Sequence, residues 1–291
     1  MKRRLVWGLP PRGLYNLCIF LGQAKNIFSL HGIELSIVEN LTGADYTQEL
    51  IKGTFDIGTC GTPPLMAALE KTTEYGVIGT GICNYPPFYL MAADSVQNVR
   101  ELKSKIIAIN QFRTCPDSVI RQLLAGEDIS LAEVTVIPLV TPSRFIDAIA
   151  NREIQAAMLW EPWVSYVERV FPWHIVVDCP RVIKPSNYAY MIYARRSLLD
   201  TESDPVRNAV DAYQKSIEYA KAHTDELLTL DYPMNYIEPK DVENALKREV
   251  PLWNTNVRLD HLIAATAEND LKKLNVISPS FSLGPFVLQA V

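Results

Sequence analysis

The sequence predicts an α/β protein with two lobes in a clamshell arrangement, each lobe a mostly parallel sheet flanked by helices. First, short apolar runs alternate with amphipathic stretches of about 10 to 17 residues, the pattern that produces parallel sheets covered by helices. Second, 291 residues exceed the usual size of a single hydrophobic core. Third, aromatic-rich extended runs at 86–93 and 188–194 suit two crossing strands that join the lobes. We therefore expect residues 1–90 plus 190–291 to form a discontinuous first lobe and residues 91–189 an inserted second lobe.

Each expected strand is a short apolar run bounded by turn-forming residues. These runs lie at 5–8, 34–39, 55–58, 75–80, 105–110, 134–139, 156–160 and 174–178. Each expected helix has apolar residues at helical spacing, and several start with proline in or near the first turn, where its missing N–H does no harm. They lie at 14–30, 45–52, 64–71, 115–124, 142–151, 162–170, 205–223, 239–248 and 259–274. The apolar tail at 274–291 is broken by proline and glycine, and we expect it to dock on the fold.

Composition excludes several classes of function. The net charge is -5 and lysine and arginine are scattered, so no basic stripe is present and nucleic acid is not an expected partner. No apolar run reaches the roughly 18 residues of a membrane helix, so no membrane insertion is expected. The five cysteines and four histidines are widely spaced, which fits neither a disulfide framework nor a metal site. We expect no metal and no cofactor.

The N-terminus leaves the cellular location open. Met1 to Arg4 resembles the charged head of a signal peptide, but Pro10-Pro11-Arg12-Gly13 interrupts the apolar segment that should follow. Cleavage after 17–24 would delete the expected first strand. We therefore expect a cytoplasmic protein, or a periplasmic one from which a signal peptide has been removed.

The stretch Ile51 to Leu65, IKGTFDIGTCGTPPL, joins a strand to a helix through small and hydroxyl residues. In open α/β sheets, ligands bind beyond the carboxyl ends of the strands, where the next helix presents free N–H groups. Thr59, Gly61 and Thr62 are therefore candidate ligand-binding residues. The structural alternative is a plain turn in which Thr62 only caps the helix.

Three other strand ends combine polar or aromatic residues with a helix start. They add the candidate ligand-binding residues Arg12, Tyr15, Asn110, Phe112, Arg113, Thr114, Trp160 and Glu161. The indoles of Trp160 and Trp163 are suited to hold a flat group between them, while Glu161 accepts hydrogen bonds from an amine, as in an aminopyrimidine. Arg12 and Arg113 suit a carboxylate, sulfonate or phosphate instead. Both halves could act on one zwitterionic ligand.

No motif in the chain requires catalysis. Gly79-Thr80-Gly81 follows a strand but lacks the third glycine of a dinucleotide fingerprint and leads into two prolines. There is no GxSxG elbow and no Walker loop. Asp117 and Glu161 are able to do acid–base work, but no catalytic residue is assigned.

Four stretches resemble the type 2 periplasmic-binding-protein fold, in the branch of aliphatic sulfonate and taurine receptors, thiamin-pyrimidine-precursor receptors and thiamin pyrimidine synthase. They are FSLHGIELSI at 28–37, LIKGTFDIGTCGTP at 50–63, ELKSKIIAI at 101–109, and 148–162 ending in LWEP. The resemblance implies an ABC-transporter type of solute-binding protein, with a small-molecule ligand and a permease as partners. The synthase's cysteine-rich iron-binding motif is absent, since the five cysteines are isolated.

The leading hypothesis is therefore a binding protein whose two hinged lobes close on a small polar or heteroaromatic molecule, such as a thiamin precursor or a sulfonate. Two alternatives stay open. One is a cytoplasmic enzyme of the same fold that acts on a pyrimidine or vitamin precursor. The other is a ligand-sensing module without a transporter.

Overall fold

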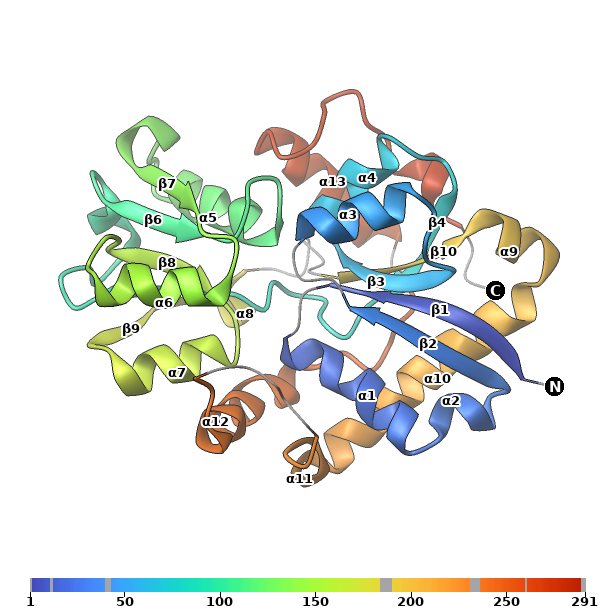
Figure 1. Ribbon diagram of the computed structural model, residues 1–291. Helices are drawn as coiled ribbons and strands as arrows, with labels where there is room; N and C mark the ends of the chain where they lie inside the picture. The colour runs from blue at the N-terminus through green and yellow to red at the C-terminus, as the bar shows by residue number, and fades with distance from the viewer. Residues whose placement is uncertain are drawn as a thin grey trace.

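The structure is a computed structural model that describes residues 2–10, 13–39, 43–183, 190–230, 236–259 and 261–288. It contains two five-stranded sheets flanked by helices, which form two lobes side by side (Figure 1). The predicted fold class, a two-lobed α/β protein, is confirmed.

The first sheet has the strand order β2-β1-β3-β10-β4. Strand β1 is parallel to β2 and β3, whereas β10 is antiparallel to both of its neighbours. The strands are β1 (Arg3–Leu9), β2 (Ile33–Glu39), β3 (Ile57–Gly61), β4 (Tyr75–Thr80) and β10 (Tyr190–Arg195).

The second sheet repeats this plan with the order β7-β6-β8-β5-β9. Strand β6 is parallel to β7 and β8, whereas β5 is antiparallel to β8 and β9. The strands are β5 (Tyr89–Ala93), β6 (Ile106–Ile109), β7 (Thr135–Pro138), β8 (Ala156–Leu159) and β9 (Trp173–Asp178).

The antiparallel strand of each sheet is the first one that the chain forms after leaving the other sheet. It therefore starts at the edge where the parallel strands end. Tyr89 starts β5 and pairs with Leu159 and Asp178, the last residues of β8 and β9. Tyr190 starts β10 and pairs with Gly61, the last residue of β3. We call these two carboxyl-end edges the inner edges of the sheets.

The helices lie on both faces of the first sheet, with α1, α2 and α10 on one side and α3, α4 and α13 on the other (Figure 1). Their bounds are α1 (Leu17–Ala24), α2 (Ile27–Leu30), α3 (Gly43–Ile51), α4 (Thr62–Leu69), α5 (Cys115–Gly126), α6 (Pro142–Ala150), α7 (Trp163–Val170), α8 (Cys179–Val182), α9 (Arg196–Thr201), α10 (Ser203–Ala222), α11 (Thr224–Leu227), α12 (Pro239–Glu249) and α13 (His261–Lys273).

Helix α12 packs against α7 of the second lobe, although it belongs to the C-terminal part of the chain (Figure 1). Arg169 on α7 donates two hydrogen bonds of 2.8 Å to the carboxylate of Asp241 on α12. The described part of the chain after residue 190 thus contributes to the surroundings of both sheets.

Two local predictions were wrong. The single helix expected at 14–30 is divided into the 3-10 turn Leu14–Asn16, α1 and α2, because Asn26 adopts a left-handed conformation with φ of 60°. The turn expected at 59–62 is absent. Strand β3 continues to Gly61 because Thr59 and Cys60 pair with β10, and α4 begins at once with Thr62.

The C-terminal tail docks on β4, as expected for its described part. Leu288 N donates a 2.9 Å hydrogen bond to Val77 O, and Val287 forms a parallel bridge with Val77. Among the described helices, none combines the length and the apolar character needed to cross a membrane.

Candidate functional site at the inner edges of the two sheets

The inner edges of the two sheets face each other across a boundary that we call the interlobe seam. The thiol of Cys115, at the start of α5, is hydrogen bonded to the backbone of Thr62, at the start of α4. Nearby, a Cβ added to Gly43 at the start of α3 would lie 3.2 Å from Oε1 of Gln111, which follows β6. Helix starts and strand ends from both lobes therefore meet at this seam.

On the first-lobe side, Tyr15 and Tyr190 form the aromatic part of the seam. Their ring centroids are 4.6 Å apart, and the side chain of Tyr15 is only 7% exposed. Burial raises the pKa of Tyr15, its hydrogen bond with Tyr190 lowers it, and the neighbouring Cys83, Cys115 and Glu249 raise it further. These neighbours come from both lobes and from α12, so Tyr15 lies at the seam.

On the second-lobe side, Asn110 and Thr114 form a turn between β6 and α5. The Thr114 hydroxyl lies 2.7 Å from Asn110 Oδ1 and 2.6 Å from Gln111 O, and Gln111 N donates to Asn110 Oδ1 at 2.7 Å. Phe112 is 48% exposed, so its ring is largely in solvent. Thr114 and Asn110 are thus held in place beside the seam.

Arg113 is bonded to the other lobe. Its Nε donates to Val276 O at 2.9 Å, and its Nη2 lies 3.1 Å from Glu70 Oε2. Glu70 also accepts from Ser278 N at 2.8 Å. Asp117 accepts from the backbone N of Arg113 at 2.7 Å, which fixes the turn that presents the guanidinium. We call these bonds among Arg113, Glu70, Val276 and Ser278 the outer contact.

Glu161 is almost fully buried, with 1% exposure. Its carboxylate accepts hydrogen bonds of 3.1 Å from both N and Oγ of Ser165, and it forms an ion pair with Arg248 of α12. Burial raises the pKa of Glu161 to about 7, while Arg248 and Ser165 act in the opposite direction. The carboxylate thus joins α12 to the start of α7.

The two indoles of the Trp-Glu-Pro-Trp stretch contact different rings. Trp160 packs edge-on against Phe88 and Phe145, with ring centroids 6.4 and 6.3 Å apart. Trp163 packs edge-on against Tyr166 at 6.2 Å. Both indole N–H groups are buried and have no partner among the described residues.

The remaining predicted residues lie as follows. Gly61 is the N-cap of α4, opposite Tyr190. Thr59 lies within β3, where its carbonyl accepts a 2.8 Å hydrogen bond from the Tyr46 hydroxyl. Arg12 lies outside the described residues, so its role stays a prediction.

The sequence analysis missed all but one member, Trp160, of a group of residues with buried polar atoms on the second-lobe side of the seam. These atoms are the hydroxyl of Tyr89, Nε1 of Trp160, Oδ1 of Asp178 and both carboxyl oxygens of Glu249, and none has a hydrogen-bond partner among the described residues. We call these four residues the inner cluster. The aromatic run at 86–93 was a visible signal for Tyr89. No local pattern marks Glu249, because only the packing of α12 on the second lobe brings it there.

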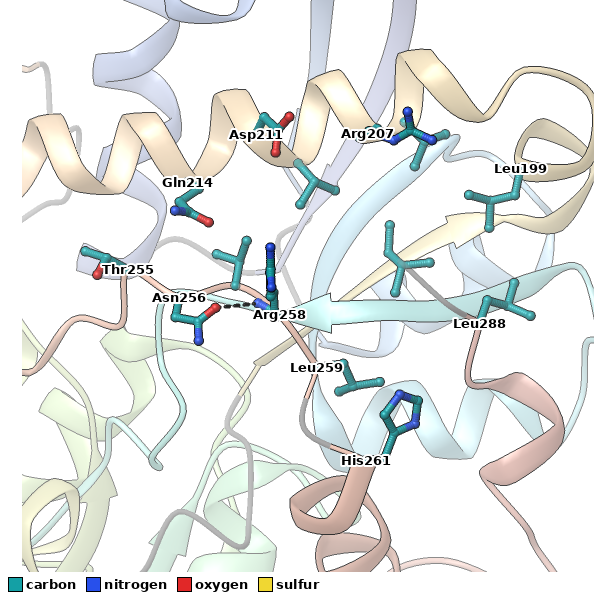
Figure 2. A pocket seen from close by; sticks show the side chains of 14 residues that line it. Leu199, Arg207, Asp211, Gln214, Thr255, Asn256, Arg258, Leu259, His261 and Leu288 are labelled. Atoms are coloured by element: carbon teal, nitrogen blue, oxygen red, sulfur yellow. Dashed lines mark hydrogen bonds between the residues drawn. The ribbon is translucent and has the colours of Figure 1, made fainter. Parts of the chain in front are cut away.

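A separate pocket of about 870 Å³ lies on the first lobe between α10 and the segment 255–261 (Figure 2). None of the predicted site residues lines it. Its rim carries both signs of charge, with Arg207 and Asp211 on α10 and Arg258 opposite them (Figure 2). Its floor is apolar and includes Ile78 and Val257.

Two lobes, each with one antiparallel strand that starts at the inner edge, define the class of two-lobed periplasmic-binding-protein folds. The structure of the alkanesulfonate-binding protein SsuA from Xanthomonas axonopodis pv. citri bound to MOPS matches with a TM-score of 0.84 and 15% identity, over 100% of both chains. The periplasmic aliphatic sulphonate-binding protein SsuA from Escherichia coli matches with a TM-score of 0.83 and 12% identity, over 100% of this chain and 94% of that one. At these identities the likeness shows the fold.

The chain belongs to the family described as NMT1/THI5 like, whose model matches residues 15–227. A putative aliphatic sulfonates-binding protein from Bacillus subtilis is 24% identical over 249 residues, which cover 85% of this chain and 73% of that protein. A desulfurization enzyme, DSZB, also shares the fold, with a TM-score of 0.68 and 16% identity over 99% of this chain and 97% of that one.

Proposed function

We propose that this protein is a solute-binding protein of the ABC-transporter type, which holds a small molecule between its two lobes and presents it to a permease. The observation that carries the proposal is the inner cluster, whose buried polar atoms have no partner among the described residues. Its members are connected: Tyr89 pairs with Asp178 in the second sheet, and Arg248, which precedes Glu249, lies over the Tyr89 ring and pairs with Glu161, the residue after Trp160. Buried polar groups in native proteins are almost always hydrogen bonded, so a group of unpaired ones at a two-lobe boundary favours a bound ligand. The curated relative named for aliphatic sulfonates supports the same class of function.

The proposed ligand-binding residues come from both lobes. Tyr15, Gly61 and Thr62 belong to the first lobe, and Asn110, Thr114 and Trp160 belong to the second. Arg113 and Glu161 are not included as ligand-binding charges, because each is already bonded across the protein. They act instead on how the lobes and α12 are held.

The lobe boundaries form part of this proposal. The predicted bounds are 1–90 plus 190–291 for the first lobe and 91–189 for the second. Because Tyr89 and Leu90 already pair in the second sheet, we propose that the chain crosses just before β5 and again before β10. The sheet topology supports this assignment. The strands between residues 3 and 80 and strand β10 form one sheet, and the strands between residues 89 and 178 form the other. Helix α12 is then an arm of the first-lobe segment that reaches the second lobe.

For the cellular location we propose the periplasm, with a permease in the adjacent membrane. The SsuA protein from Escherichia coli, which shares the fold, is periplasmic, and this supports the same location. The enzyme alternative has the fold of DSZB in its favour. The cysteines do not favour it, since burial raises the pKa of all five thiols and so disfavours the reactive thiolate.

Native mass spectrometry of the gently purified protein tests the proposal. We expect a non-covalent adduct of one small molecule per chain, which is released unchanged on denaturation. Trp160→Ala should lose the adduct, whereas Arg207→Ala, in the separate pocket on the first lobe, should keep it. An adduct that is retained in Trp160→Ala but lost in Arg207→Ala would contradict the proposed site, and chemical conversion of the released molecule would favour the enzyme.

A further inference from the structure

Glu249 is the most unusual polar residue of the described chain. It ends α12, its side chain is 1% exposed, and neither carboxyl oxygen has a hydrogen-bond partner among the described residues. The adjacent Arg248 forms ion pairs with Glu161 and with Glu168, the latter at 2.7 Å. The two neighbours therefore differ sharply, since Arg248 is doubly paired while Glu249 has no partner.

The groups around Glu249 come from several elements. Asp178 from the end of β9 and Glu161 from the start of α7 both raise its pKa, and Arg248 lowers it. Burial raises the pKa of Tyr15, Cys83, Tyr85 and Tyr89, and Glu249 raises it further. Arg248, the residue before Glu249, lies over the Tyr89 ring, 5.6 Å from its centroid. The carboxyl group thus lies among aromatic side chains that belong to both lobes.

An unpaired carboxyl group in such a place is costly. Desolvation of an unsatisfied buried polar group costs about 1 to 3 kcal/mol, and more when the group is charged. A packed apolar side chain of similar size would avoid this cost. The presence of a carboxyl group at this position is therefore best explained if the bound ligand supplies its hydrogen-bond partner.

The charges of the seam restrict what that partner can be. The described arginines that contact seam residues are all paired: Arg113 with Glu70, Arg181 with Asp178, and Arg248 with Glu161. Arg248 is shared between Glu161 and Glu168, and Asp178 pairs with Arg181 through its other oxygen at 3.1 Å, so Glu249 is the carboxyl group here without a cation among the described residues. An anionic ligand head placed here would meet carboxyl groups without a free described cation, whereas an N–H donor would meet an unpaired acceptor.

We propose that Glu249 is a specificity-determining ligand-binding residue, which accepts hydrogen bonds from an uncharged or cationic nitrogen-bearing ring of the solute. This inference rests on the proposed function and names the chemistry of the same site. The hydroxyl of Tyr89 and the indole N–H of Trp160 supply further hydrogen-bonding groups, and their rings supply flat apolar surface. Arg248 is a positioning residue, because it fixes α12 through Glu161.

Isothermal titration of the full chain tests the proposal with three probes: cytosine as a neutral ring, benzamidine as a cationic amidine, and 1-hexanesulfonate as an anion. We expect at least one nitrogen probe to bind more tightly than the sulfonate. Glu249→Leu should weaken that binding about 10- to 100-fold, the effect of losing a hydrogen bond to a charged group. Glu249→Gln should weaken benzamidine more than cytosine, because it removes the charge and keeps an acceptor. The control Glu243→Gln, on the exposed face of α12, should change neither affinity.

The outcomes separate this inference from the proposed function. Binding of the sulfonate alone would overturn the inference and leave a solute-binding protein. Binding of a nitrogen probe that Glu249→Leu leaves unchanged would remove Glu249 from the site. If no probe binds, the adduct from native mass spectrometry decides: an N–H-bearing ring supports the inference, an anion overturns it, and absence of any adduct overturns both proposals. Thermal melts of each variant confirm that the compared proteins are folded.

Discussion

The outer contact and the inner cluster lie at the same boundary between the lobes, but they differ in whether their polar groups have hydrogen-bond partners. In the outer contact every named polar group has a partner: Arg113 bonds to Val276 and Glu70, and Glu70 bonds to Ser278. In the inner cluster the named atoms have no partner among the described residues. The outer contact is also partly exposed, with 50% of the Arg113 side chain in solvent, whereas Glu249 is buried.

This difference assigns different tasks to the two regions. A paired, solvated contact contributes little free energy, and it opens and closes without leaving unsatisfied buried groups. Unpaired buried groups instead make the closed arrangement unfavourable until something binds to them. Under the proposed function, the outer contact would orient the two lobes, and a ligand bound at the inner cluster would keep them closed.

The largest expected effect comes from removing the ion pair that anchors the arm carrying Glu249. Arg248→Ala leaves the buried Glu161 without its cation, so the free energy of unfolding in urea should fall by about 3 kcal/mol. The double variant Arg248→Ala with Glu161→Gln should recover part of this loss. The matched control Arg100→Ala removes a surface ion pair within the second lobe and should change stability by less than about 1 kcal/mol. Equal losses in Arg248→Ala and Arg100→Ala would show that Glu161 does not depend on its partner.

The second largest expected effect is an increase in stability. Glu249→Leu should stabilise the ligand-free protein by about 1 to 3 kcal/mol, because an unpaired carboxyl group leaves the interior. Burial raises the pKa of Glu249 well above 4.5, so the folded state binds a proton that the unfolded state releases. The wild type therefore loses stability as the pH rises from about 4.5 through the folded-state pKa. The advantage of Glu249→Leu should accordingly be small in acid and grow toward alkaline pH in urea titrations.

A constant difference across that pH range would mean that Glu249 does not titrate differently in the folded and unfolded states. Glu243→Gln is the control for loss of an acidic residue from α12 and should show no such pH dependence, because its side chain is exposed and paired with Lys247. The sign of the Glu249→Leu effect also distinguishes a ligand-binding carboxyl group from a structural one. A structural carboxyl group would make its own removal destabilising.

The sequence predicts the strands, most long helices and the two-lobed class, because these depend on local periodicity and on chain-order alternation. It misses the end of β3, since Thr59 and Cys60 are held in the sheet by β10, more than a hundred residues away. It identifies Arg113 and Glu161 as charges beside strand ends, but their partners Glu70 and Arg248 are distant in the chain. Local sequence patterns indicate at which strand end a charged residue lies. They do not indicate which distant residue forms the ion pair with it.

A smaller effect is expected from breaking the outer contact. Arg113→Ala should widen the distribution of lobe separations in solution, seen as a larger radius of gyration in small-angle scattering of the ligand-free protein. Stability should fall by no more than about 1 kcal/mol, because the ion pair with Glu70 is solvated. Glu70→Gln should reproduce the change, and the double variant should add little to it. Unchanged scattering in all three variants would show that the outer contact does not hold the lobes.

The smallest effect belongs to Cys115, whose thiol meets the backbone of Thr62 across the seam. Sulfur is a weak hydrogen-bond acceptor, so Cys115→Ala should lower stability by about 1 kcal/mol or less. Burial raises the pKa of this thiol to about 12, which keeps it protonated and slow to react with iodoacetamide. Cys18 is also buried, with 0% exposure against 6% for Cys115, but it lies within α1 of the first lobe. Mass spectrometry should therefore show that Arg113→Ala speeds the alkylation of Cys115 relative to the wild type and leaves that of Cys18 unchanged. An unchanged Cys115 rate would place this thiol away from the surface that opens.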